Sequence, residues 1–194
     1  MSNSLPVYYI NSKHPHAALE LGRQLCTLLK KDENQNLLPV ILCIGTDRVT
    51  GDSLGPLAGT FLSAYTKENP LPVYGTLEFP VHALNLESIW KQIKKKHPCS
   101  PVIAVDASLG AKKHLGYITF GQGSLSPGAG VSKTLTSVGD FFITGIINTA
   151  VPEAQLALQN TRLSSVADMA CCIAHGLLYA FCPQALVAAC SFYS

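Results

Sequence analysis

The chain has 194 residues and a formal net charge of +2, and it is 47% hydrophobic but only 13% charged. This length suffices for one domain with a substantial core, so we expect residues 1–194 to form a single domain. The small net charge argues against nucleic-acid binding. The charged fraction lies below the roughly 25% usual for soluble domains, which favours a homodimer that buries further surface. No signal peptide and no apolar run of about 18 residues is visible, so we expect a cytoplasmic protein that does not enter the membrane.

Apolar spacing along the chain predicts alternating strands and helices. The predicted helices cover residues 17–31, 53–67, 85–97, 153–161 and 164–181. The predicted strands cover residues 40–44, 71–77, 101–105, 116–121 and 139–149. This alternation predicts an α/β fold, a three-layer sandwich with a mostly parallel sheet.

Two carboxylates follow apolar strand segments. Asp52 lies in the polar, glycine-rich turn after residues 40–44, and Asp106 directly follows residues 102–105. Because parallel strands end at the same edge of a sheet, the two side chains are expected to converge there. Each aspartate also has a purely structural interpretation: Asp52 can cap the N-terminus of the following helix, and Asp106 can accept a hydrogen bond from a neighbouring loop. Taken together, they can share a proton and activate water, or bind a metal through their oxygens.

Further polar residues are expected to contact a substrate at this edge. Asp47 and Arg48 occupy the same turn as the first carboxylate, where a surface salt bridge is the alternative. Glu78 and His82 follow the strand at residues 71–77, and a histidine there can carry a proton near neutral pH. The alternative for His82 is a histidine whose hydrogen bonds are satisfied within its loop.

A long loop rich in glycine and serine covers residues 122–136, and loops of this length are usually functional or disordered. Gly128 and Gly130 allow backbone N–H groups to approach a ligand closely, and Lys133 adds a cation. The loop lacks the spacing of a P-loop or a dinucleotide fingerprint, so no nucleotide cofactor is expected. The chain also lacks a G-x-S-x-G motif, which argues against a serine nucleophile.

Three ordered motifs resemble those of the spore germination protease, an unusual aspartic endopeptidase. Gly45–Pro56 (GTDRVTGDSLGP) resembles its first signature, Val105–Leu109 (VDASL) its second, and Pro127–Val131 (PGAGV) a third. Essentially the full chain resembles the YyaC-type sporulation proteins, which are similar to that protease. The resemblance implies a phosphorylase/hydrolase-like α/β fold, shared with the hydrogenase-maturation endopeptidases.

Carried over by position, the resemblance places Asp52 and Asp106 where the protease has its two catalytic aspartates. It implies a sporulation-associated endopeptidase, without metal or cofactor, in the cytoplasm of the spore or the sporulating cell. Its partners would be protein or peptide substrates, with small acid-soluble spore proteins as candidates.

The maturation enzymes have metal-contacting acidic residues at the same two positions and a histidine in a later loop. The corresponding stretch here, Val131–Lys133, holds no histidine, so a metal site would need His82. Two alternatives therefore stay open. One is a metal-dependent maturation peptidase, and the other is a non-catalytic sporulation protein that binds a peptide or partner in the same cleft.

Overall fold

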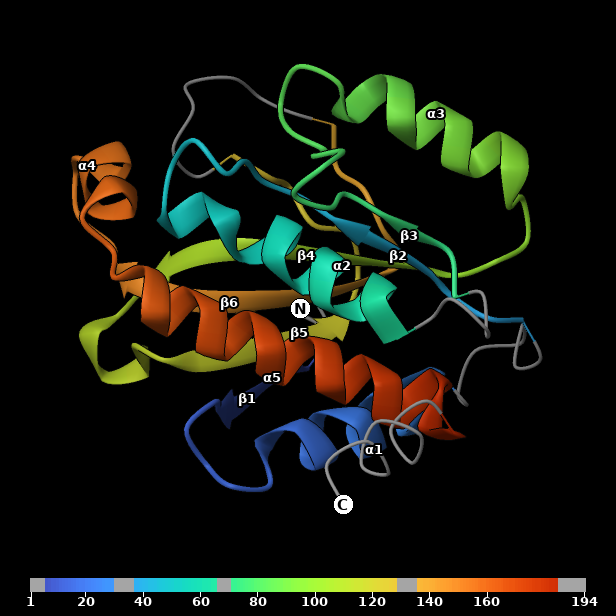
Figure 1. The fold of residues 1–194 in the computed structure, drawn as a ribbon, viewed down its shortest axis with the longest axis horizontal. Coiled ribbons are helices and arrows are strands. Elements are labelled where there is room, and N and C mark those ends of the chain that lie inside the picture. Colours follow the sequence, from blue (N-terminus) through green and yellow to red (C-terminus); the bar gives the residue numbers. More distant parts are fainter. Residues whose placement is uncertain (1–5, 30–36, 66–70, 129–135, 185–194) are drawn as a thin grey trace, which may run out of the picture.

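The computed structural model describes residues 6–29, 37–65, 71–128 and 136–184. They form a mixed α/β fold with one six-stranded sheet, in the order β1-β5-β6-β4-β2-β3 (Figure 1). The strands are β1 (Val7–Asn11), β2 (Val40–Cys43), β3 (Val73–Tyr74), β4 (Val102–Gly110), β5 (Tyr117–Gln122) and β6 (Phe141–Thr149). The α-helices are α1 (Ala17–Leu29), α2 (Leu54–Tyr65), α3 (Leu86–Lys96), α4 (Ala154–Gln159) and α5 (Leu163–Phe181). Two 3₁₀ turns, η1 (Gly51–Ser53) and η2 (Lys112–His114), complete the elements.

The sheet is mostly parallel, as the sequence predicts. β3, β2, β4 and β6 run parallel to their neighbours, whereas β5 is antiparallel to both β6 and β1. All four residues of β2 and the first five of β4 are buried, which explains their continuous apolar runs. The parallel strands therefore end together at one edge, called here the carboxyl edge.

Alternate residues of the central strands face two apolar clusters on opposite sides of the sheet. Ile103 and Val105 of β4 belong to the larger cluster, with buried residues of α1, α2 and α5. Val102 and Ala104 belong to the smaller one, with Leu86 and Ile93 of α3 included. Figure 1 shows α1, α2 and α5 lying together on the viewer's side of the sheet, with α3 apart from them at the top. Apolar packing thus holds both faces of the central strands.

Several elements differ from those expected. β1 was not predicted, and because β1 takes the edge position, β5 lies one strand inside it. The strand predicted at residues 71–77 shortens to Val73–Tyr74, since Pro72 before it has no N–H to donate and Gly75 after it has φ of +88°. α5 begins at Leu163, one residue before the predicted helix start at Ser164.

Among the described residues, α5 has the length and apolar composition of a helix that could span a membrane. In the structure it is a core helix that packs against α1 and α2. Its buried residues are Val166, Met169, Ala170, Ile173, Ala174, Gly176, Leu177 and Leu178. The packing of α5 within the fold accounts for its apolar composition.

Candidate functional site at the carboxyl edge

A tight turn after β2 places Asp52 at the carboxyl edge. Gly45 has φ of +140°, and a Cβ there would collide with the carbonyl oxygen of Asp52. A Cβ on Gly55 would likewise collide with Ile44, so both glycines let the start of α2 come directly against the end of β2. The Thr46 N–H donates to the Asp52 carbonyl oxygen at 3.1 Å and closes the turn. Asp52 itself lies in η1.

Asp106 belongs to β4 and lies just beyond the end of β2. The last residue of β2, Cys43, pairs with Val105, so Asp106 has passed the end of that neighbouring strand. On its other side Asp106 pairs with Thr144 of β6. Its side chain is 6% exposed, and Oδ1 accepts a hydrogen bond from the Ala107 N–H at 2.7 Å. The strand thus presents a nearly enclosed carboxyl group at the carboxyl edge.

Both carboxylates line one cavity of about 220 Å³. Val49 and Leu109 contribute apolar walls, and Ser108 also lines the cavity, with its hydroxyl group donating to the Gly145 carbonyl at 3.2 Å. Gly128, Gln155 and Leu158 complete the wall on the side of the β5–β6 loop and α4. The expected convergence of the two aspartates is therefore present in the structure, in a space of side-chain size.

Burial raises the pKa of Asp106 well above its ordinary value, and the negative charge of Asp52 raises it further. The hydrogen bond from Ala107 opposes these effects. Burial also raises the pKa of Asp52, but a backbone hydrogen bond from Thr46 and the nearby His82 stabilise its ionised form. When two close carboxyl groups have environments this different, one keeps a proton while the other ionises.

Comparison with known proteins places these residues in a family. A family model described as "Protein of unknown function (DUF1256)" matches residues 9–176, which include both aspartates and the cavity walls. The chain belongs to the DUF1256 family. It is 44% identical over 169 residues to the uncharacterized protein YyaC of Bacillus subtilis (strain 168). That match covers 87% of this chain and 81% of YyaC, so the expected YyaC-type resemblance is confirmed.

Of the other residues expected at the site of this DUF1256 protein, only some line the cavity. Of the glycine-rich loop, Gly128 lines the cavity, whereas Gly130 and Lys133 lie outside the described residues. His82 is half-buried beside the site, and its Nδ1 accepts a hydrogen bond from the Leu84 N–H at 3.3 Å.

Three more of the expected contact residues are exposed and do not line the cavity: Asp47, Arg48 and Glu78. Their proposed contact with substrate therefore depends on a ligand that extends beyond the cavity.

The sequence prediction missed cavity residues of three elements in the DUF1256 chain: the turn after β2 (Thr46 and Val49), β4 (Ala107, Ser108 and Leu109) and α4 (Gln155 and Leu158). Ser108 lies two residues after Asp106 on the same strand, so the period of a β-strand could have indicated that they share a face. Gln155 and Leu158 of α4 had no such signal. α4 is held near the cavity by Asn148 of β6, whose Nδ2 donates to the Ala157 carbonyl at 2.8 Å.

A metal-dependent maturation peptidase would need enough side chains in one place to coordinate the ion. Across residues 6–29, 37–65, 71–128 and 136–184, no group of three or more His, Cys, Asp or Glu side chains is arranged to hold an ion. Asp52 and Asp106 could supply two oxygen ligands, and His82 lies near Asp52 without lining the cavity. The DUF1256 cavity therefore presents a carboxylate pair to a ligand.

Proposed function

We propose that the protein is an aspartic-type endopeptidase in which Asp52 and Asp106 share one proton. The supporting observation is that both carboxyl groups line one small cavity, where burial and then the charge of Asp52 raise the pKa of Asp106. A protonated and an ionised carboxyl group in one cavity can supply the acid and the base for hydrolysis of a peptide bond. The proposed phosphorylase/hydrolase-like fold agrees with the parallel strands that end at this cavity.

The environments of the two carboxyl groups assign their roles. Asp52 is the base, because Thr46 and His82 stabilise its ionised form. It takes a proton from water as the water oxygen attacks the carbonyl carbon, while Asp106 protonates the carbonyl oxygen. Asp106 then recovers a proton from the tetrahedral intermediate, Asp52 passes its proton to the nitrogen, and the C–N bond breaks. Both carboxyl groups return to their starting states.

This assignment gives a bell-shaped dependence of activity on pH. On the acid side, activity falls as Asp52 becomes protonated and can no longer accept a proton from water. On the alkaline side, activity falls as Asp106 loses the proton that polarises the substrate carbonyl. The raised pKa values of both groups move the active range toward neutral pH.

The substrates we propose are small acid-soluble spore proteins, in the cytoplasm of the spore or sporulating cell. This part of the proposal is supported by the resemblance of the three motifs to the germination protease. Gly128 lines the cavity, and its backbone N–H is the proposed donor of a second hydrogen bond to the substrate carbonyl oxygen as that oxygen takes the proton of Asp106.

Cleavage of purified small acid-soluble spore proteins between pH 5 and pH 8 tests the function. We expect the wild type to cleave them and Asp52→Asn and Asp106→Asn each to lose about 10²–10⁴-fold in rate, the usual contribution of a positioned acid or base. The reactions are run with and without EDTA, and mass spectrometry identifies the new termini. Undiminished cleavage by either folded variant would contradict the carboxylate pair. Binding without cleavage by the wild type would instead identify a non-catalytic peptide-binding protein.

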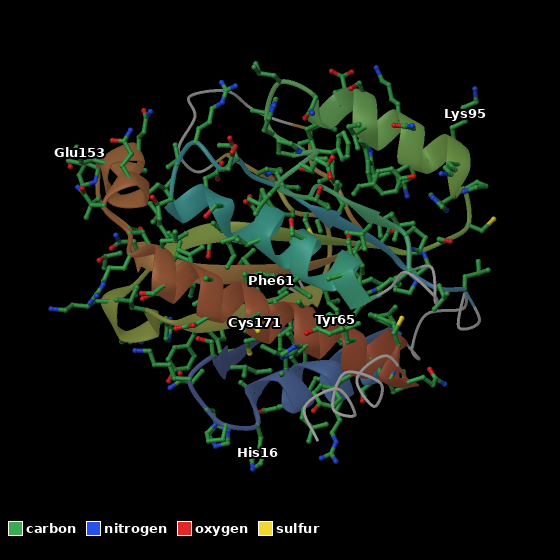
Figure 2. All side chains as sticks on the ribbon, in the orientation of Figure 1. His16, Phe61, Tyr65, Lys95, Glu153 and Cys171 are labelled. Atoms are coloured by element: carbon green, nitrogen blue, oxygen red, sulfur yellow. The ribbon has the colours of Figure 1, made fainter. Side chains whose placement is uncertain are left out.

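We also propose that the protein forms a homodimer through α2 and α5. α2 contains no charged residue in its 12 positions, and Tyr65 at its end is exposed. Solvent-facing helix sides ordinarily carry charges. Phe61, Tyr65 and Cys171 lie on these two helices on the viewer's side of the molecule (Figure 2). Sedimentation velocity tests this, and a Tyr65→Lys variant should shift a dimer toward monomer.

A further inference from the structure

The loop between β3 and α3 exposes two large apolar side chains to solvent. Phe79 is 72% exposed and Leu84 is 88% exposed, more than any other large apolar side chain in the described ranges. Single exposed apolar residues are common and need no explanation. These two, however, lie five positions apart in one short loop and flank His82, which adjoins the candidate site. We call Phe79 and Leu84 the apolar rim.

Hydrogen bonds within the loop hold the rim in place. The Phe79 N–H donates to Thr76 Oγ1 at 3.1 Å, and the Thr76 N–H donates to the Phe79 carbonyl at 3.2 Å. Asn85 joins the other end, since its Oδ1 accepts from the His82 N–H at 2.8 Å and its Nδ2 donates to the Pro80 carbonyl at 3.0 Å. The backbone around the two side chains is thereby fixed before any partner binds, which lowers the entropic cost of binding.

The loop is also connected directly to the turn that carries Asp52. Val81 forms a parallel bridge with Ile44, and its carbonyl accepts the Gly45 N–H at 2.8 Å. The next residue, His82, is near enough to stabilise the ionised form of Asp52. The loop that carries the rim is therefore joined to the turn that carries Asp52 at the carboxyl edge.

α4 brings further apolar side chains to the cavity wall and to the surface near it. α4 contributes Leu158 to the cavity wall and carries Leu156, which is 55% exposed. Figure 1 shows α4 at the end of the molecule where β4 and β6 end. Besides the rim, a ligand that fills the cavity and extends past it therefore has an exposed apolar side chain of α4 available for contact.

We propose that the apolar rim binds a bulky apolar side chain of an extended polypeptide segment, a few residues from the bond held at Asp52 and Asp106. This inference rests on the proposed function and specifies its substrate class. A cavity of about 220 Å³ has room for side chains next to one peptide bond and excludes a folded domain. The segment must therefore be extended, with each residue advancing it by about 3.3–3.6 Å.

Charge favours a polypeptide over a membrane surface as the occupant. Residues 71–85 contain no lysine or arginine, and Glu78 is exposed next to Phe79. Membrane-binding apolar surfaces ordinarily carry basic residues that attract anionic lipid. A carboxylate next to the rim opposes that attraction, whereas an extended polypeptide can place an uncharged or basic residue beside it.

Binding can be measured apart from cleavage in the Asp106→Asn background. The probe is fluorescein-labelled, reduced and carboxymethylated α-lactalbumin, an extended chain with many apolar residues, followed by fluorescence anisotropy. Adding Phe79→Ser and Leu84→Ser together should raise Kd at least tenfold. Val7→Ser is the matched control, since Val7 is 46% exposed on β1, at the other end of the sheet from β3, and its Kd should not change.

An unchanged Kd in a folded Phe79→Ser/Leu84→Ser protein would overturn the inference. A second outcome would also overturn it. If the Phe79→Ser/Leu84→Ser substitutions change the sedimentation coefficient of the unliganded protein, the rim joins two copies of the chain rather than binding a polypeptide substrate. The proposed function fails separately. If the wild type never cleaves but the double variant loses binding, the result supports binding at the rim and rejects the peptidase activity. If cleavage persists with unchanged KM in the double variant, the peptidase stands and the rim does not.

Discussion

Two regions of the molecule enclose opposite kinds of chemical group. One is the helix layer formed by α1 and α5, and the other is the carboxyl edge of the sheet. In the layer, Leu21 and Leu25 of α1 and Leu177 of α5 are fully buried in one apolar cluster. At the carboxyl edge, the enclosed groups are two carboxyl groups with raised pKa values. Burying a leucine side chain contributes about 1.5–3 kcal/mol, whereas enclosing an ionised carboxylate costs free energy. The residues that supply most of the stability and those that form the site therefore occupy separate regions, which mutations should affect independently.

Truncation in the apolar layer should have the largest effect on stability. Leu25→Ala is expected to lower the free energy of unfolding by about 2–5 kcal/mol, because it removes buried methyl groups and leaves a cavity. Urea denaturation followed by circular dichroism measures the loss. The pH profile of activity of the remaining folded protein should match that of the wild type. A changed profile would show instead that the two regions are coupled.

Replacing Asp106 at the carboxyl edge should change the free energy of unfolding in the opposite direction to Leu25→Ala, and the size of the change should depend on pH. The pKa of Asp106 is raised in the folded protein, so between about pH 4 and that raised pKa the unfolded chain binds fewer protons than the folded one. Wild-type stability therefore falls as pH rises through this range. Asp106→Asn removes this contribution to the decline and can still accept the Ala107 N–H through its amide oxygen.

Denaturation of the Asp106 variant at pH 4.5, 6 and 7.5 tests the sign. The stability of the variant relative to the wild type should increase as pH rises from 4.5 until the pH passes the raised pKa of Asp106. Asp47→Asn is the control, because Asp47 is exposed and does not line the cavity. A stability difference between wild type and Asp106→Asn that stays constant with pH would show that Asp106 titrates alike in both states.

The smallest effect is expected in the loop that carries the apolar rim. Asn85→Ala removes the side-chain bonds to the His82 N–H and the Pro80 carbonyl, which should lower stability by about 1 kcal/mol. Faster hydrogen exchange at the His82 amide would localise the change to this loop. Gln92→Ala, at an exposed position of α3, should alter neither quantity. Asn85→Ala therefore separates the order of the loop that carries the rim from the stability of the core.

The central strands and the convergence of the two aspartates could be predicted because their signals are local. β2 and the start of β4 are buried on both faces, so each is a continuous apolar run that ends next to a polar turn. β1 gave no such signal, since its residues alternate irregularly between exposed and buried. The part of α4 in the cavity wall depends on the hydrogen bond between Asn148 and Ala157, a tertiary contact that no spacing reveals.

β1 has a consequence for how the protein is made. Its ladder partner is β5, and the register joins Val7 to Gly121 and Asn11 to Tyr117. A ribosome adds about 5–20 residues per second, so roughly 5–20 s pass between synthesis of β1 and synthesis of its partner. During that interval Tyr8, Tyr9 and Ile10 belong to a nascent chain whose first strand has nothing to pair with. Translation speed and chaperone binding over this stretch should therefore influence the yield of folded protein more than they would for a chain that begins with a helical hairpin.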